Sequence, residues 1–576
     1  MTTVAEQIVT ALADLGVRTV WGVVGDALNP VTDAIRRQER IEWIGTRHEE
    51  AAAFAASAQA QLTGTIGVCM GTVGPGALHL LNGLYDAKKS HAPVLAICGQ
   101  VPSAELGADY FQEVDNDAVF RDVAAFRHTV TAASQMPRVL EQAVQIAYAK
   151  PGVSVLTLPG DIGSAAVAKD SVVHITRVPA HLTPDDGEIT RAVRLLDDAE
   201  TVTMLVGAGA RDCRDPLLEL ADRLAAPMVL TLKAKEGLED GNPFQIGQSG
   251  LIGNPATREA FETADALLMI GTDFPYPEWL PDKTPTVQID VHADHIGRRT
   301  PVDVGIVGDA GLSVTALLKR LRGKQDRTHL ERARSDYEHW QSRQHRLTDP
   351  DFDHGLLGKV RSRLDNSEAR IRPEALATLV DTHAADDTVF TTDTGMSTVW
   401  LARCVTMRGT RRLIGSFNLG SMANALPQAL GAAALDRGRP VVAFCGDGGL
   451  TMLLGELLTA LAHELPVKLV VFDNGRLGMV KLEQEQGGLP EFGTGLANPD
   501  LAAVAAAMGM QAARVTEPEQ LEAAVRTALA APGPYLLDVV TNPEEIALPP
   551  KTGVDQAWGF AIAKLKEGIG GRGAKS

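Results

Sequence analysis

Short apolar runs alternate with helix-like segments along most of this 576-residue chain. Strands are expected, for example, at Thr65–Met70, Val94–Cys98, Ala266–Ile270 and Val441–Cys445. Parallel strands need crossover connections, usually helical, so this alternation predicts parallel sheets with helices on both faces. The predicted fold class is α/β, with three doubly wound parallel-sheet domains.

Changes in composition suggest where the domains begin and end. A polar stretch with prolines near residues 178–187 predicts a linker, and the highly charged residues 320–372 predict a solvated helical connector. The predicted divisions are an N-terminal domain (1–185), a central domain (186–325), the connector (326–372), a C-terminal domain (373–548) and a tail (549–576).

Charge and cysteine content limit the classes of function. Lys and Arg number 54 against 72 Asp and Glu, and the net charge of −18 argues against nucleic acid as a partner. The five cysteines have no CxxC spacing, which argues against a disulfide framework or a cysteine zinc site. With no signal-like opening and no apolar membrane span, a cytoplasmic location is expected.

Two long stretches, residues 51–85 and 414–435, contain no Lys, Arg, Asp or Glu. Their many Gly, Asn, Gln, Ser and Pro residues would be unfavourable in lipid. We therefore expect both stretches to be buried against a cofactor or a second subunit.

The segment around Gly446-Asp447-Gly448 carries the strongest chemical signal. Asp447 follows one predicted strand and Asn474 follows the next, and the carboxyl ends of parallel strands meet at one sheet edge. Their oxygens suit Mg²⁺, while Gly448 and Gly449 would let backbone N–H groups approach a diphosphate. Either strand-to-helix turn alone is common in α/β proteins, but the two together are a specific signal for a metal and diphosphate site.

Gly-Asp-Gly, 24 residues and then Asp473-Asn474 resembles the signature of thiamine-diphosphate-dependent enzymes, although that family has Asn where Asp473 stands. The resemblance implies that Asp447, Asn474 and the backbone carbonyl of Arg476 bind the metal. The other thiamine diphosphate contacts that it implies are Gly420, Ser421, Met422, Gly448, Gly449, Gly475, Arg476, Leu477, Gly478, Met479 and Val480.

Glu49 stands at a predicted helix start, where an acid is favoured by the helix dipole by ~0.3–1 kcal/mol without any catalytic role. Beside the metal motif, the resemblance implies that Glu49 hydrogen-bonds N1′ of the aminopyrimidine and promotes loss of the thiazolium C2 proton. Met422 would hold the cofactor bent. Glu50 is expected to be structural.

Several segments are similar to the bacterial pyruvate dehydrogenase (quinone) family, also called pyruvate oxidase: WGVVGD, RHEEAAAFAA, GTVGPGALHLLNGLYDA and GSFNLGSMANALPQALGA. This resemblance implies FAD in the central domain. The expected FAD contacts are Ser249, Gly250, Leu251, Ile252, Thr272, Asp273, Phe274, Pro275, Tyr276 and Asp290. Gly207–Asp212 only half matches a dinucleotide fingerprint, which disfavours a nicotinamide dehydrogenase.

Further candidate catalytic residues come from the same resemblance. Phe111 and Phe120 match aromatic residues where the thiamine and flavin sites approach each other, and Glu483 matches the oxidase pattern. Single phenylalanines are more often core residues. His91 is interpreted equally well as a substrate neighbour or a core histidine. Met479 replaces the phenylalanine of the oxidase.

The reaction implied is oxidative decarboxylation of pyruvate to acetate and CO₂, with electrons passing through FAD to a quinone or oxygen. The alternatives are an acetolactate synthase-like carboligase and a related 2-oxo acid decarboxylase. The synthase family has Gln-Trp soon after Gly-Met-Val, whereas this chain has Leu482-Glu483. A non-catalytic scaffold is disfavoured because Glu49, Asp447 and Asn474 are all present.

The resemblance also implies a homodimer or homotetramer, with Glu49 of one subunit facing the metal motif of another. The tail lacks the terminal membrane-binding helix of the quinone-linked family, so at most a weak peripheral membrane contact is predicted for residues 557–569. Residues 351–368 are extra relative to the family, and no function is predicted for them.

Overall fold

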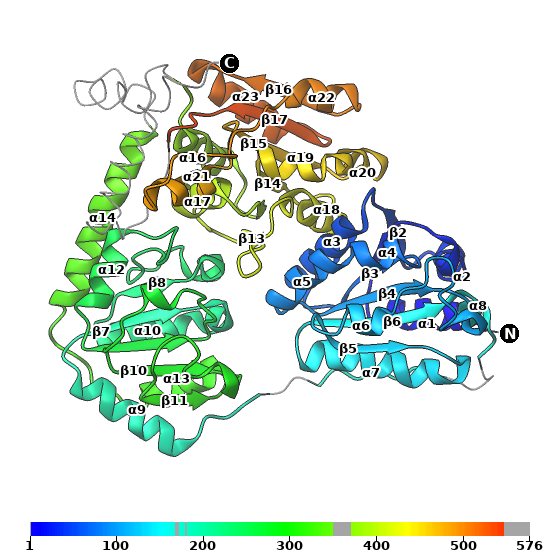
Figure 1. The fold of residues 1–576 in the computed structure, drawn as a ribbon. Coiled ribbons are helices and arrows are strands. Elements are labelled where there is room, and N and C mark those ends of the chain that lie inside the picture. Colours follow the sequence, from blue (N-terminus) through cyan, green and yellow to red (C-terminus); the bar gives the residue numbers. More distant parts are fainter. Residues whose placement is uncertain (1, 168–171, 179–180, 349–369, 546–576) are drawn as a thin grey trace.

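The computed structural model describes residues 2–167, 172–178, 181–348 and 370–545. It contains three α/β units, each built on its own parallel sheet (Figure 1). The predicted fold class is therefore confirmed. The tail and the extra residues 351–368 lie outside the described residues.

The N-terminal sheet has the strand order β2-β1-β3-β4-β6-β5. Its strands are β1 (Thr19–Gly22), β2 (Glu42–Gly45), β3 (Gly67–Gly71), β4 (Val94–Gln100), β5 (Ala124–Thr129) and β6 (Val153–Pro159). Its helices are α1 (Val4–Asp14), α2 (Asn29–Arg36), α3 (Glu49–Thr63), α4 (Pro75–His79), α5 (Leu81–Lys89), α6 (Asn116–Val119), α7 (Met136–Ala149) and α8 (Gly160–Ser164). The central strands β3, β4 and β6 are buried along their whole length, as expected for a sheet covered on both faces.

The C-terminal sheet repeats that strand order, as β13-β12-β14-β15-β17-β16. Its strands are β12 (Val389–Thr392), β13 (Arg412–Gly415), β14 (Val441–Gly446), β15 (Val467–Asp473), β16 (Gln511–Val515) and β17 (Tyr535–Val540). Its helices are α16 (Pro373–His383), α17 (Met396–Cys404), α18 (Ala425–Leu435), α19 (Asp447–Met452), α20 (Leu457–Ala462), α21 (Gly478–Gln486), α22 (Leu501–Ala507) and α23 (Pro518–Ala530). The two outer domains thus share one topology.

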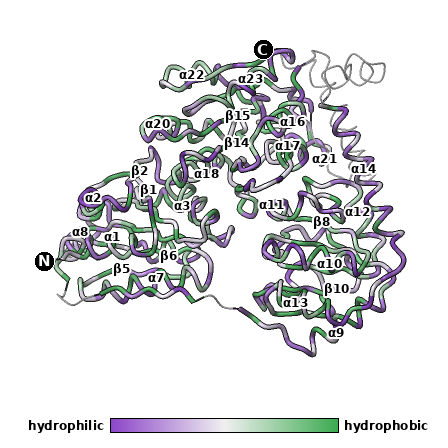
Figure 2. The backbone as a smooth tube through the Cα atoms, turned by 180° about the vertical axis from the view of Figure 1, so that it is seen from behind, coloured by the Kyte–Doolittle hydropathy of each residue, from purple (hydrophilic) through white to green (hydrophobic). Residues whose placement is uncertain are grey.

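The central sheet is smaller, with the order β11-β10-β9-β7-β8. Its strands are β7 (Val202–Val206), β8 (Met228–Leu230), β9 (Ala266–Ile270), β10 (Thr286–Asp290) and β11 (Val304–Val307). Its helices are α9 (Asp186–Asp198), α10 (Arg214–Leu224), α11 (Lys235–Leu238), α12 (Pro255–Glu262) and α13 (Ala310–Leu318). The helical part of the connector is α14 (Thr328–Leu347), a largely hydrophilic helix along the edge of the central domain (Figure 2).

Helices α3 and α18 pack together at the centre of the molecule, joining the N- and C-terminal domains. Because α3 is alanine-rich and buried on all sides, the helices approach closely. A Cβ added at Gly431 would lie 2.4 Å from the carbonyl oxygen of Ala55. In this region the two uncharged stretches are buried against each other within one chain, whereas burial of their other parts against a cofactor or a second subunit stays a prediction.

A charge network around buried Glu236 joins all three domains. The Glu236 carboxylate of the central domain accepts hydrogen bonds from Arg211 (2.6 Å), from Arg412 of β13, and from the backbone N–H of Leu413 (3.0 Å). Arg412 also donates to the carbonyl of Leu62 at the end of α3 (3.1 Å). One arginine therefore ties the C-terminal domain to both of the others.

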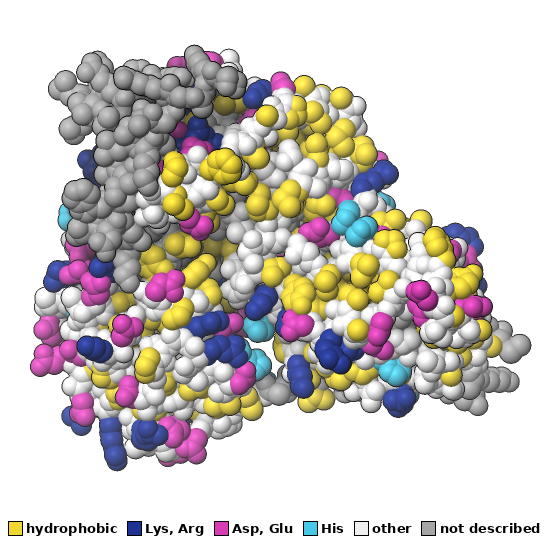
Figure 3. Space-filling model, in the orientation of Figure 1, with side chains coloured by type: hydrophobic (Ala, Val, Ile, Leu, Met, Phe, Trp, Pro, Cys, Tyr) yellow, Lys and Arg dark blue, Asp and Glu magenta, His cyan; other side chains and the backbone are white. Residues whose placement is uncertain are grey.

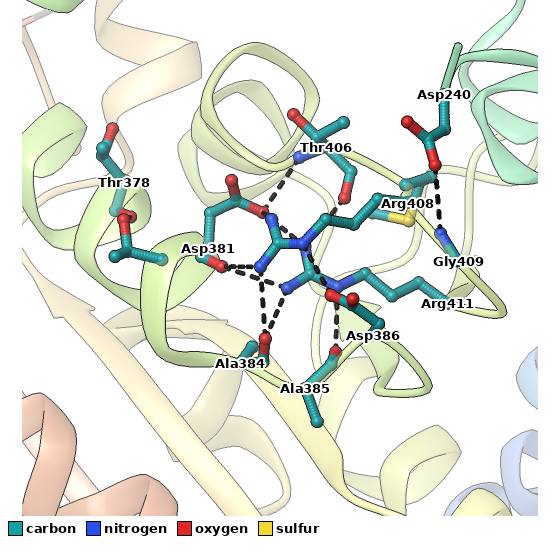
Figure 4. A network of polar contacts seen from close by, with 12 residues as sticks. Asp240, Thr378, Asp381, Ala384, Ala385, Asp386, Thr406, Arg408, Gly409 and Arg411 are labelled. Carbon is teal, nitrogen blue, oxygen red and sulfur yellow. Dashed lines mark hydrogen bonds and ion pairs between the residues drawn. The ribbon is translucent and has the colours of Figure 1, made fainter.

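The loop that leads into β13 is held by a second network (Figure 4). Asp381 accepts from Arg408 (3.1 Å) and from Arg411, whose side chain is completely buried. The backbone N–H of Gly409 donates to Asp240 of the central domain (3.2 Å). These bonds fix the start of the strand that carries Arg412.

We predict that Gly431→Ala destabilises the protein, although alanine is normally more favourable than glycine in a helix interior by about 1 kcal/mol. The new methyl group would overlap the backbone of α3, and such overpacking typically costs about 1–3 kcal/mol of unfolding free energy. Urea denaturation followed by circular dichroism measures the change. Gly533→Ala is the control, since a Cβ there meets no atom within 4 Å. A more stable Gly431→Ala protein would contradict this packing.

Candidate active site

The C-terminal sheet brings the predicted metal ligands together at one edge. Strands β14 and β15 are parallel neighbours with Gly446 opposite Phe472, so Asp447 and Asn474 emerge side by side. The Asp447 carboxylate accepts from the backbone N–H of Gly475 (3.0 Å) and from Asn498 (2.5 Å). The convergence of these segments agrees with the sequence prediction.

The environment of Asp447 suits a bound cation. Burial, together with the neighbouring charge of Asp473, raises the pKa of Asp447 to about 6. A divalent cation would supply the positive charge that stabilises this carboxylate. The amide oxygen of Asn474 accepts the Arg476 N–H at 3.0 Å, so this segment turns tightly beside Asp447. These hard oxygen donors fit Mg²⁺.

The glycines after Asp447 form a narrow backbone cradle. A Cβ at Gly449 would lie 2.4 Å from an Asp393 carboxylate oxygen, and one at Gly448 would lie 3.3 Å from the terminal methyl of Met422. Only glycine leaves this backbone open to a diphosphate. The structure thus places Met422, the predicted support of the cofactor, directly beside the cradle.

Asp393 is a site residue that the sequence analysis missed. It is buried and accepts from the backbone N–H groups of Ala425 (2.9 Å) and Gly446 (3.2 Å), which fixes the start of α18 and the end of β14. Burial raises the pKa of Asp393 to about 7. The signal was available, because Asp393 directly follows β12 at the same sheet edge as Asp447.

The predicted cofactor loop at residues 420–422 is tied to the N-terminal domain. The Ser421 hydroxyl accepts from Asn82 of α5 (2.9 Å), and Asn82 also donates to Glu50 (2.6 Å). Ala423 has a φ of +64°, a strained conformation for a residue with a side chain. Glu50 is therefore linked to the loop through Asn82.

Glu49 begins α3 with its side chain largely buried. One carboxylate oxygen lies 2.9 Å from Nδ1 of His79, at the end of α4, and the ring of His79 stacks on that of His48 with centroids 4.4 Å apart. The sequence analysis did not single out His79, which lies 30 residues away in a different segment. Among the described residues, no hydrogen bond joins Glu49 to the metal motif of the same chain.

The turn before Glu49 is held by the C-terminal domain of the same chain. Buried Glu456 accepts from the backbone N–H groups of Arg47 (3.0 Å) and His48 (2.9 Å), and its second oxygen accepts from Thr459 (2.6 Å). Burial raises the pKa of Glu456. This contact was also missed, since its partners lie about 400 residues apart.

The predicted FAD residues line a cavity of about 620 Å³ where the three domains meet. That volume is within the usual range of cofactor sites. Nine of the ten line it; Gly250 does not, and a Cβ there would lie 3.3 Å from the Phe274 ring. Gly420 and Met479 of the predicted thiamine site line the same cavity. The arrangement fits a flavin next to the thiamine cofactor.

Charged and histidine side chains gather along the boundary between the N-terminal and central domains (Figure 3). His91, with a φ of +53°, reaches the cavity and places Nε2 3.9 Å from Asp273. Burial opposes ionisation of Asp273, but the nearby His91 and the guanidinium of Arg299, which donates a hydrogen bond at 3.2 Å, outweigh it and lower the pKa of Asp273 to about 2. His91 is therefore a cavity residue and not a core histidine.

The remaining candidate residues lie in different environments. Glu483 lines a small recess with Leu251 and Met479. Phe111 is 79% exposed, whereas Phe120 is completely buried in a hydrophobic cluster. The catalytic roles of Glu483, Phe111 and Phe120 stay predictions.

No helix among the described residues is long and apolar enough to span a membrane.

Three family models match the chain. They describe the N-terminal TPP binding domain (residues 2–119), the central domain (189–317) and the C-terminal TPP binding domain (393–539) of thiamine pyrophosphate enzymes. The chain belongs to this enzyme family, so the predicted thiamine diphosphate dependence is confirmed at the level of the family.

Relatives cover nearly the whole chain. It is 38% identical to a Bacillus subtilis (strain 168) protein provisionally named thiamine pyrophosphate-containing protein YdaP, over 98% of this chain and 96% of the relative. It is 30% identical to pyruvate oxidase of Lactiplantibacillus plantarum, over 96% of this chain and 91% of the relative. It is 32% identical to the acetolactate synthase isozyme 2 large subunit of Escherichia coli (strain K12), over 93% of this chain and 95% of the relative. Overall similarity therefore does not separate oxidase from synthase.

We predict that Glu456→Ala lowers turnover by about 10–100-fold, because the turn carrying Glu49 loses two hydrogen bonds and small misplacements of catalytic groups are costly. Steady-state kinetics of the purified full-length enzyme measures the effect. Glu456→Gln is the matched control, since its amide oxygen still accepts hydrogen bonds. Full turnover in Glu456→Ala would show that this contact does not position Glu49.

Proposed function

We propose that this chain catalyses the oxidative decarboxylation of pyruvate, or of a similar small 2-oxo acid, using thiamine diphosphate, Mg²⁺ and FAD. The observation that carries the proposal is the cavity between the domains, which brings nine predicted FAD residues to the same space as Gly420 and Met479. Electrons could then pass directly between neighbouring cofactors. A quinone or oxygen would reoxidise the flavin, in the cytoplasm.

The chain's own residues bind and orient the cofactor. Asp447, Asn474 and the Arg476 carbonyl would hold Mg²⁺, and Gly448 and Gly449 would receive the diphosphate. When bound, thiamine diphosphate supplies the carbanion and the electron sink that decarboxylation of a 2-oxo acid requires. Met422 lies against Gly448, and we assign to it the role of supporting that cofactor.

Glu49 would control a proton at the pyrimidine ring. Its buried carboxyl group would hydrogen-bond N1′, and His79 orients it through the 2.9 Å contact to one carboxylate oxygen. Burial of the Glu49 carboxylate limits its contact with water and strengthens the hydrogen bonds that it accepts.

We further propose that a homodimer or homotetramer completes the site. Apolar side chains are exposed beside each half of the proposed active site. Leu78 lies next to His79 in the N-terminal domain, and Met452 lies at the end of α19 in the C-terminal domain. A partner subunit covering them would bring its metal motif to Glu49, consistent with the lack of a hydrogen bond between these groups within the described part of one chain.

An acetolactate synthase-like carboligase is the second candidate, because relatives with that name match as well as the oxidase does. The synthase would use the same cofactors. Glu483 beside Leu251 and Met479, in place of the synthase Gln-Trp pair, favours the oxidase.

Anaerobic flavin bleaching tests the proposal. Protein loaded with FAD, Mg²⁺ and thiamine diphosphate should lose its oxidised flavin absorbance when pyruvate is added, and protein without thiamine diphosphate should not. Adding a quinone or air then identifies the acceptor. If the flavin stays oxidised while acetolactate accumulates, the enzyme is a synthase. If pyruvate is not consumed, pyruvate is not the substrate.

Glu49→Gln should retain FAD and metal but lose about 10²–10⁴-fold in turnover, because an amide cannot hold the proton at the pyrimidine. Flavin absorbance measures FAD content and steady-state kinetics measures turnover. Glu50→Gln, which keeps an oxygen to accept from Asn82, should retain most activity. Equal activity in the Glu49→Gln and wild-type enzymes would rule out this mechanism.

A further inference from the structure

Three potential metal ligands converge at the start of α3. His48, Glu49 and His79 each offer one ligand atom, and these atoms lie within 4.8 Å of one another. We propose that, in the absence of thiamine diphosphate, these three residues bind one Zn²⁺ or a similar transition-metal ion per chain. We propose also that the ion and thiamine diphosphate exclude each other at Glu49; this second part rests on the proposed role of Glu49.

One pair of the three ligands is already in contact, and the third lies beside it. The Glu49 carboxylate is 9% exposed and already contacts Nδ1 of His79 at 2.9 Å. The rings of His48 and His79 are stacked, 4.4 Å apart at 25°. Both histidines are partly exposed, at 38% and 47%, so an ion can reach them and their rings can turn toward it.

The donor set selects the class of metal. Two imidazole nitrogens with one carboxylate oxygen suit Zn²⁺, Co²⁺ or Ni²⁺, and three protein ligands leave one position open for water. The oxygen donors at Asp447 and Asn474 instead suit Mg²⁺. The chain would therefore offer two metal sites with different ligands: a site with two imidazole nitrogens in the N-terminal domain and a site of hard oxygen donors in the C-terminal domain.

Coordination would cost one local hydrogen bond. Nδ1 of His48 accepts the backbone N–H of Glu50 at 3.2 Å and caps α3. If the ion bound through that nitrogen, one coordination bond would replace this contact. The ion would also bind the Glu49 carboxylate that the pyrimidine needs, which is why metal and cofactor should compete.

The test uses untagged full-length protein freed of metal and thiamine diphosphate, with Mg²⁺ in excess. Co²⁺ should give a visible absorption band that saturates at one ion per chain, and Zn²⁺ should remove it. Because an outer-shell partner alone is worth roughly 10–100-fold in affinity, His79→Asn should weaken binding by about 100-fold or more.

His48→Asn is the second variant, since asparagine is itself a good helix N-cap and should leave α3 intact. It should weaken Co²⁺ binding as well, whereas His345→Asn, at an exposed position on α14, should not. Thermal unfolding confirms that each variant is folded. No Co²⁺ band in the wild type, or unchanged affinity in both His48→Asn and His79→Asn, would overturn the site.

Competition is measured separately, by adding thiamine diphosphate to the Co²⁺-loaded protein. Loss of the band is expected. Co²⁺ that stays bound at saturating thiamine diphosphate would overturn the mutual exclusion. Failure of the proposed function would appear differently, as flavin that pyruvate does not bleach, and it would leave the Co²⁺ titration of the cofactor-free protein unchanged.

Discussion

The close crossing of α3 and α18 is the contact on which the rest of the site depends. Glu49 is the first residue of α3, and the loop ending at Met422 leads directly into α18. Because Gly431 lets the backbones touch near Ala55, neither helix can shift without moving the other. The N-terminal domain and the cofactor loop are therefore fixed by one steric contact, which Glu456 reinforces at the beginning of α3.

Both outer domains place chemistry at the carboxyl ends of parallel strands, as their shared topology allows. In the N-terminal domain Glu49 lies at the start of the helix that follows β2, and His79 lies after β3. In the C-terminal domain Asp393 and Asp447 directly follow β12 and β14. The same fold thus presents a carboxylate–imidazole pair on one side and a set of hard oxygen donors on the other.

The sequence predicted the buried strands of the three sheets, the edge strands β2 and β8, and the convergence of Asp447 and Asn474, but not the other edge strands or the long-range contacts. The four strands it missed, β5, β11, β13 and β16, all lie at sheet edges, where exposure permits polar residues such as Arg127 and His128 in β5. Asp447 and Asn474 were found because each follows a strand. Glu456 acts through partners about 400 residues away, which no local pattern reveals.

The fold does not by itself choose between oxidase and synthase, since relatives of both kinds match more than nine-tenths of the chain. A flavin in the cavity would lie beside the thiamine loop in either case, because Gly420 and Met479 line that cavity. We propose that the distinction lies in side chains at the recess that Leu251, Met479 and Glu483 share. In the oxidase that we propose, the Glu483 carboxylate would repel a second anionic 2-oxo acid more than an indole ring would, and this repulsion would disfavour carboligation.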